Sequence, residues 1–215
     1  MTRLFITRPR YDKGTEYLYA YSEIVINAAK NRGWKTDISD GRQASQFEAR
    51  SRLNRKSADF IFFNGHGTES EMCGNRGHII VDEHSSGLLK GSITFTRACS
   101  CVVGLGKSAV SNGCRAFIGY TGEFWIPRVN KYELTPLKDP AAKPVLEVSN
   151  AVPLAIIKNS TVTDSVDSAK KLALKHISKL LLSEEPYDRA ALKALVQNNS
   201  LLSYEGNGNS RVEIS

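Results

Sequence analysis

The sequence has few cysteines and no long apolar run, and both scarcities limit what the protein can be. Its 215 residues include four cysteines, too few for the disulfide framework of a small secreted domain: Cys73, Cys99, Cys101 and Cys114. No stretch approaches the roughly 20 apolar residues that span a bilayer. Residues 1–6 lack the apolar core and cleavage site of a signal peptide. We therefore expect a cytoplasmic protein with no membrane partner, in a compartment that keeps thiols reduced.

The sequence also lacks a cluster of basic residues. The net charge is +7, but the basic residues are scattered, with no aromatic-interleaved basic patch and no helix-turn-helix signature. Direct nucleic-acid binding is therefore not expected. The 41% apolar and 24% charged residues are ordinary for a globular protein. We expect one domain over residues 1–200 and a C-terminal tail over 201–215.

Short apolar runs alternate with segments of helical periodicity through the first half of the chain. Strands are expected at 4–7, 34–38, 59–63, 92–98 and 115–120, and helices at 14–32, at 42–53 and briefly between Gly104 and Gly113. This alternation predicts an α/β fold, a three-layer α/β/α sandwich around a mostly parallel sheet. The segment between the third and fourth strands reads as turns and a small hairpin.

The second half is richer in helices. Residues 121–144 contain four prolines and form an irregular stretch of the length often found in functional loops. Helices are expected at 145–158, from an N-cap at Thr163-Asp164, and at 186–198. The residues from 204 onward, with a short apolar run at 211–214, are expected to form an edge strand or a loose tail.

Two of the expected strands lead directly into a reactive side chain. The run 59–63 is followed by Asn64-Gly65-His66-Gly67, and the run 92–98 ends in Arg97-Ala98-Cys99. Since parallel strands meet ligands at their carboxyl ends, His66 and Cys99 are expected to lie together. A lone cysteine there is usually a buried apolar residue, and a lone histidine is usually structural. The two together indicate a nucleophile and its base.

The chemistry of a thiol nucleophile explains the neighbouring residues. A cysteine attacks as the thiolate, so it needs a base such as His66 to take its proton. Gly67 lets the main chain approach a substrate closely, and its N–H, together with that of Cys99, is expected to form an oxyanion hole.

These motifs resemble those of the caspase-type cysteine peptidases, in which one strand ends in His-Gly and another in a small residue and Cys. His66 and Cys99 stand 33 positions apart, closer than the roughly 50 of caspases. Ser100 and Cys101 occupy positions where the caspase pattern has Arg, Gln or Gly and then Gly, so the match is partial.

Bacterial CHAT-domain proteases resemble the chain more closely. Their nucleophile block is similar to Ala98-Cys99 followed by Gly104-Leu105-Gly106, a strand at 116–120 and Trp125. The link 159–164 also resembles one that joins two helices in those proteins. The resemblance implies an endopeptidase with a His-Cys dyad and no cofactor, acting on a protein substrate. It also implies control by a regulatory protein partner or complex, through a switch expected in the loop 121–144, and a role in bacterial defence or programmed cell death.

In these families the residue two positions before the nucleophile lines the specificity pocket. Metacaspases, which cut after basic residues, carry an acid there, and caspases carry a glutamine. This chain carries Arg97, which is expected to disfavour basic residues before the cut and to favour acidic or polar ones; a structural role for Arg97 is the alternative. Glu123 and Trp125 are the other expected substrate-binding residues, although a solvated loop charge is the alternative for Glu123.

Three alternatives remain open. Cys101 is a rival nucleophile, although the Ala-Cys pattern favours Cys99. An amidotransferase-like hydrolase is a rival enzyme, but there the cysteine usually precedes the histidine. An inactive scaffold of caspase type is the non-enzymatic rival. The spacing of Cys73, His78 and His84 matches no zinc motif, so no metal is expected.

Overall fold

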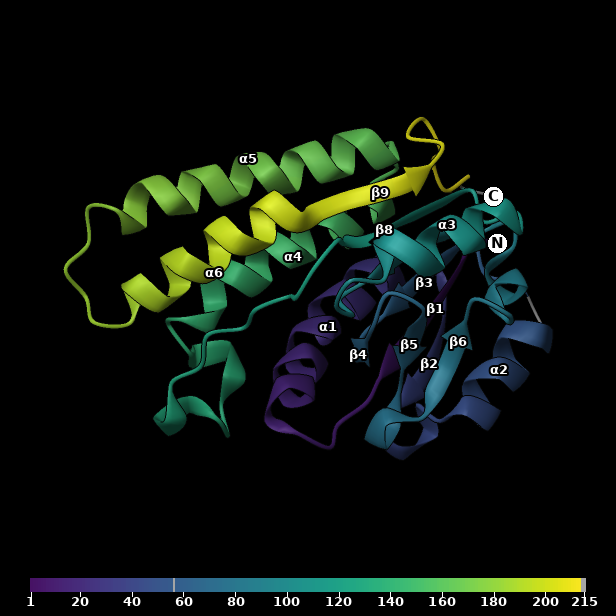
Figure 1. The fold of residues 1–215 in the computed structure, drawn as a ribbon, viewed down its shortest axis with the longest axis horizontal. Coiled ribbons are helices and arrows are strands. Elements are labelled where there is room, and N and C mark those ends of the chain that lie inside the picture. The colour runs from purple at the N-terminus through teal and green to yellow at the C-terminus, as the bar shows by residue number, and fades with distance from the viewer. Residues whose placement is uncertain (56, 214–215) are drawn as a thin grey trace.

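A six-stranded sheet forms the centre of the protein (Figure 1). The computed structural model describes residues 1–55 and 57–213. In spatial order the strands are β2 (Lys35–Asp40), β1 (Arg3–Arg8), β3 (Phe60–Phe63), β7 (Ile93–Thr96), β8 (Ala116–Tyr120) and β9 (Leu202–Gly206). The first five run parallel, and β9 pairs antiparallel with β8. The mostly parallel sheet expected from the sequence is confirmed.

Strand β3 shows why a strand in the middle of this sheet is wholly apolar. Phe60 and Phe62 enter the core on one face of the sheet, whereas Ile61 and Phe63 enter the core on the other. Successive side chains of a strand point to opposite faces, so a strand covered on both sides buries every residue.

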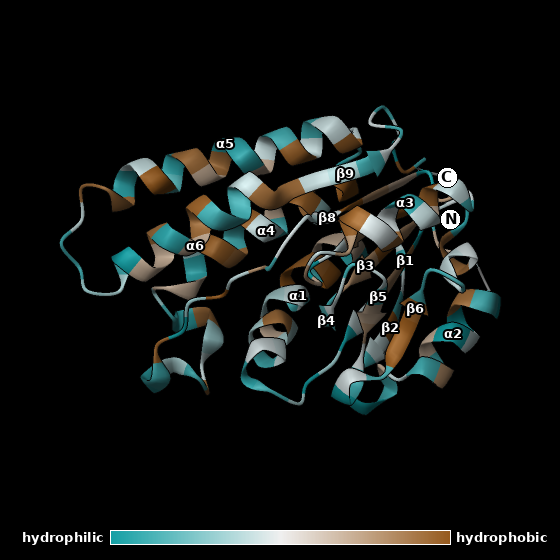
Figure 2. Cartoon of the chain, viewed as in Figure 1, coloured by the Kyte–Doolittle hydropathy of each residue, from teal (hydrophilic) through white to brown (hydrophobic). Residues whose placement is uncertain are grey.

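Helices cover both faces and complete three layers (Figure 1). One face carries α1 (Lys13–Asn31), α4 (Ala142–Ile157), α5 (Val162–Leu180) and α6 (Asp188–Leu201). The other carries α2 (Gln46–Arg55), α3 (Lys107–Ser111) and a small antiparallel sheet of β4 (His66–Gly67), β5 (Glu71–Cys73) and β6 (Ile79–Asp82). Figure 2 shows apolar and polar residues alternating along α5, as expected of a helix with one buried side. None of the helices in the described ranges is both long and apolar enough to cross a bilayer.

Two helices begin at caps that differ from the expected start. Helix α5 is capped by Thr161 rather than by Thr163-Asp164, because the Thr161 hydroxyl accepts a hydrogen bond from the Asp164 N–H at 3.0 Å. Helix α1 is capped by Asp12, whose side chain accepts from Thr15 N–H in a capping box.

The C-terminal residues include an edge strand, one of the two structures expected for them, although it lies at the start of the 201–215 segment. Leu202–Gly206 forms β9, which pairs with β8 from Tyr120 to Ala116, because α6 delivers the chain to the open edge of β8. The run at 211–214 is not the edge strand: residues 211–213 adopt no strand, and Ile214 lies outside the described residues. Val212 is nevertheless fully buried in the main core.

Candidate active site

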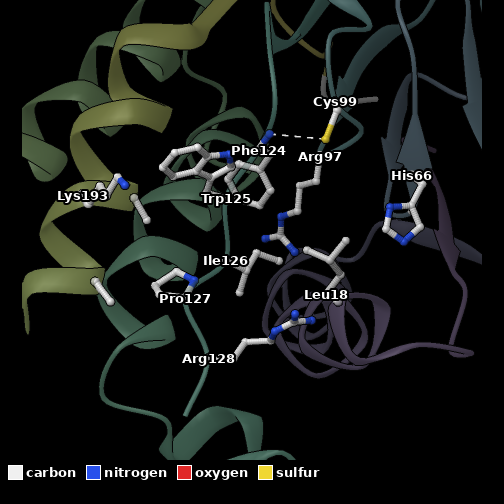
Figure 3. Close-up of a pocket in the computed structure, with 14 residues that line it drawn as sticks. Leu18, His66, Arg97, Cys99, Phe124, Trp125, Ile126, Pro127, Arg128 and Lys193 are labelled. Atoms are coloured by element: carbon white, nitrogen blue, oxygen red, sulfur yellow. Dashed lines mark hydrogen bonds between the residues drawn. The ribbon is translucent and has the colours of Figure 1, made fainter. Parts of the chain in front are cut away.

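His66 and Cys99 line one pocket of about 440 Å³ at the carboxyl ends of the central strands (Figure 3). Strands β3 and β7 are parallel neighbours in which Phe63 faces Thr96, so the residues after each strand emerge side by side. The structure therefore brings together the histidine and the cysteine that the sequence pairs.

Two hydrogen bonds join the segment that follows His66 to the segment that follows Cys99. The Leu105 N–H donates to the Glu69 carbonyl at 2.6 Å, and the Cys101 thiol donates to the Glu71 carbonyl at 3.4 Å. A Cβ on Gly104 would lie 2.6 Å from the Glu69 carbonyl oxygen. Gly104, five positions after Cys99, is thus needed for close contact with the hairpin that follows His66.

Asp12 is a third functional candidate, and sequence reasoning missed it. Its Oδ2 lies 2.7 Å from His66 Nε2, while its Oδ1 accepts the Thr15 N–H at 2.8 Å. The cap therefore holds the carboxylate in the orientation that meets the imidazole. With Nε2 engaged, Nδ1 is the ring nitrogen left to exchange a proton with a thiol.

The local environment keeps Asp12 ionised. Burial raises the pKa of its carboxyl, but the hydrogen bonds from Thr15 and His66 outweigh burial and leave that pKa below its usual value. The Asp-x-x-Thr spacing is a recognisable helix start, so the cap was visible in the sequence. Its contact with His66 was not, because 54 positions separate the two residues.

Cys99 sits at a sharp turn and is half-buried. Ser100 has a φ of 58°, an uncommon value for a residue with a side chain, and its N–H donates to the Gly122 carbonyl at 2.9 Å. The Cys99 Sγ accepts a hydrogen bond from Phe124 N–H at 3.4 Å. Burial raises the pKa of the thiol, the Phe124 N–H opposes that rise, and the Glu123 carboxylate adds to it. The raised pKa favours the neutral thiol of Cys99 over its thiolate.

Of the two expected oxyanion donors, Cys99 lines the pocket and Gly67 does not. Thr68 N–H donates to Glu71 O in the β4–β5 hairpin, so the next pair, Gly67 and Met72, is the non-hydrogen-bonded type whose N–H groups point away from the partner strand. Within residues 1–55 and 57–213, no acceptor other than its own sulfur receives the Cys99 N–H.

Arg97 forms the deep end of the pocket and is only 1% exposed. Its Nε donates to Ser149 Oγ at 3.0 Å and its Nη1 to Asn64 Oδ1 at 3.1 Å, while Nη2 donates to Asn150 Oδ1. The guanidinium also lies 4.8 Å from the centre of the Phe62 ring. Burial lowers the pKa of Arg97 to about 10, and the nearby Tyr120 and Tyr21 oppose this.

The remaining candidates divide between the pocket and its surroundings. Trp125 lines the pocket, but Glu123 does not: it is exposed and accepts a hydrogen bond from the Trp125 indole at 3.1 Å. The rival nucleophile Cys101 is completely buried under the hairpin, and burial raises the pKa of its thiol. In the described part of the chain no group of three or more His, Cys, Asp or Glu side chains is arranged to hold a metal ion.

No protein-family model and no curated protein sequence matches this chain. Solved structures match its fold. The Arg-specific cysteine proteinase gingipain R superposes with a TM-score of 0.63 at 10% identity, over 98% of this chain and 47% of that one. A complex of the pro- and mature domains of Porphyromonas gingivalis RgpB gives a TM-score of 0.58 at 11% identity, over 98% and 48%. A structure described as a protease gives 0.59 at 12%. The chain spans about half the length of these neighbours and has the caspase-like fold of these cysteine proteinases.

Proposed function

We propose that this protein is a cysteine endopeptidase that uses Cys99 as nucleophile and His66 as general base and acid. One observation carries the proposal: a half-buried thiol and an imidazole braced by a carboxylate line the same pocket, on a fold shared with cysteine proteinases. Nucleophile, base and orienting group in one constellation are typical of nucleophilic catalysis.

In the proposed hydrolysis of a peptide bond, each step is assigned to particular residues. As the Cys99 sulfur attacks the scissile carbonyl carbon, its proton passes to His66 Nδ1, and Asp12 stabilises the imidazolium that forms. The negative charge on the carbonyl oxygen is met by the N–H groups of Gly67 and Cys99. The C–N bond then breaks, the amine leaves with the proton from His66, and a thioester remains. Water, deprotonated by His66, attacks the thioester and releases the acid product and the free thiol.

An activity assay combined with alkylation tests the assignment. Incubation with a randomised peptide library, followed by mass spectrometry, is expected to show cleavage products for the wild type and none for Cys99→Ala. His66→Ala is expected to lower turnover by about 10²–10⁴-fold, the usual contribution of general acid–base catalysis. Iodoacetamide is expected to label Cys99 in preference to Cys101, which is buried. Cys101→Ala serves as the matched control.

Each rival predicts a different result. Loss of cleavage in Cys101→Ala with retention in Cys99→Ala would identify Cys101 as the nucleophile in place of Cys99. Hydrolysis of glutamine but of no peptide would identify an amidotransferase-like enzyme. A Cys99 that is alkylated no faster in the wild type than in His66→Ala, with no peptide cleaved, would favour the inactive scaffold.

The CHAT-type motifs support two finer parts of the proposal: control by a regulatory protein partner and a role in bacterial defence or programmed cell death. The Phe124 N–H donates to the Cys99 sulfur, and this contact of the loop after β8 supports control through that loop. Movement of that loop would change both access to the thiol and its pKa.

A further inference from the structure

Arg97 has hydrogen-bonding capacity that the protein does not use. A guanidinium carries five N–H donors, one on Nε and two on each terminal nitrogen. Three of the five are engaged, one on each nitrogen, by Ser149, Asn64 and Asn150. The remaining two belong to different terminal nitrogens. Such a pair matches the two oxygens of a carboxylate.

The charge of Arg97 is also unbalanced. Its three acceptors are a hydroxyl and two amides, all neutral, and no carboxylate of the described residues forms an ion pair with it. Burying an ion without a counter-ion is costly. Among the described residues, no Asp or Glu lines the pocket, whereas Arg128 and Lys193 in its lining add positive charge. The walls, including Leu18 and Trp125, are apolar.

We propose that Arg97 binds the carboxylate side chain of an acidic residue, aspartate or glutamate, immediately before the cut. This deepens the proposed peptidase function and rests on it. The pocket holds Cys99 and the deep Arg97 together, so a substrate whose carbonyl meets the thiol directs its preceding side chain toward the guanidinium (Figure 3). Cleavage after an acid sets this protein apart from its Arg-specific structural neighbour.

Matched peptides separate the effect of the charge of the side chain before the cut from the effect of its shape. Fluorogenic peptides that differ only at the residue before the cut are compared as pairs, Asp with Asn and Glu with Gln, with Lys and Arg added. A charge-assisted pair predicts a kcat/KM about 10- to 100-fold higher for the acid than for its amide, and the lowest values for Lys and Arg. Arg97→Gln is expected to remove the acid preference, and Arg97→Lys to keep part of it. Arg42→Gln, which removes an exposed positive charge away from the pocket, is the control for net charge.

A second readout does not depend on turnover or on the Arg97 variants folding. Peptide aldehydes ending in Asp, Asn or Lys compete with iodoacetamide for Cys99 of the wild type, and the Asp aldehyde is expected to protect at the lowest concentration. Equal protection by Asp and Asn, or better protection or cleavage with Lys or Arg, would overturn the acid preference while leaving the peptidase intact. No protection and no cleavage with any peptide would instead remove the proposed function itself.

Discussion

Cys99 differs from a nucleophile that rests as a thiolate. Burial raises the pKa of its thiol, and Glu123 raises it further, so the thiolate is scarce at neutral pH. The N–H groups of Phe124 and of Cys99 itself oppose this rise, and Phe124 has the larger effect. In the proposed mechanism, proton transfer to His66 is therefore coupled to attack, and the orientation of the imidazole becomes important for the rate.

Asp12→Asn tests that orientation at the scale of one residue. Asn is similar in size but carries no charge to stabilise the imidazolium, and its amide can reverse the tautomer of His66. We expect kcat to fall about 10- to 100-fold while KM changes little, as for other residues that orient a catalytic group. Thr15→Ser, which keeps the hydroxyl of the capping box, is the control. A kcat that matches the wild type would remove Asp12 from the mechanism.

The difference in stability between wild type and Asp12→Asn should depend on pH. The pKa of Asp12 is lowered in the folded state, so its stabilising effect is complete above the pKa of the unfolded chain and is lost as the pH falls through the folded value. The advantage of wild type over Asp12→Asn in urea unfolding should therefore be complete at neutral pH, begin to decline near about pH 4, and vanish only below the lower pKa that Asp12 has in the folded state.

These residues show what sequence can reveal about a site. His66 and Cys99 were predictable, because each follows an apolar strand and parallel strands align their ends. Asp12 was predictable only as a cap, since nothing local connects it to His66. The neutral cradle of Arg97 was equally hidden, because Asn64, Ser149 and Asn150 come from two distant segments.

Among the elements near the site, the two-residue strand β4 leaves no space for a side chain at Gly67. A Cβ on Gly67 would lie 2.6 Å from the Glu71 carbonyl oxygen, 2.7 Å from Cys101 Sγ and 2.8 Å from Ala98 Cβ. The Glu71 oxygen belongs to the main chain, and the Ala98 Cβ is bonded directly to it, so neither atom can move aside without moving the backbone. There is thus no space for any other residue between the hairpin and the segment that carries Cys99.

Gly67→Ala is therefore expected to destabilise the fold and displace the Gly67 N–H. Overpacking of this kind costs about 1–3 kcal/mol in free energy of unfolding. The loss of an oxyanion donor lowers turnover by about 10²–10³-fold. Gly87→Ala is the matched control, because no atom lies within 4 Å of its added Cβ. Urea unfolding and peptide cleavage measure the two effects, and equal behaviour of both variants would refute the steric account.

Element boundaries were less accessible to sequence than element types. The strands and main helices occur in the expected order, but α4 begins at Ala142, before the expected 145, and includes Pro153 in its interior. The buried Asp139 explains the early start: its carboxylate accepts from the N–H groups of Ala141 and Ala142. It also accepts from the Tyr17 hydroxyl of α1 at 2.6 Å, a tertiary contact that periodicity does not reveal.

At the scale of the whole molecule, β9 brings the C-terminal part of the chain back to the central sheet. The segment after α6 adds an antiparallel strand to the parallel sheet and then returns across the core, where Thr2 Oγ1 donates to the Glu213 carbonyl at 3.1 Å. The first and last described segments therefore meet beside the sheet (Figure 1). A chain about half the length of its structural neighbours thus has a continuous core that extends to residue 212.

Val212→Ala tests whether these last residues belong to that core. Val212 is fully buried, so truncation removes two methyl groups and leaves a cavity, with an expected loss of about 1–3 kcal/mol in free energy of unfolding. The neighbouring Arg211 is exposed, and Arg211→Ala should stay within about 0.5 kcal/mol of wild type. Both values come from urea denaturation followed by circular dichroism. If Val212→Ala were as stable as Arg211→Ala, residues 207–213 would be an independent tail. A measured loss confined to Val212 would instead make them part of the cooperative unit that supports β8 and the loop over Cys99.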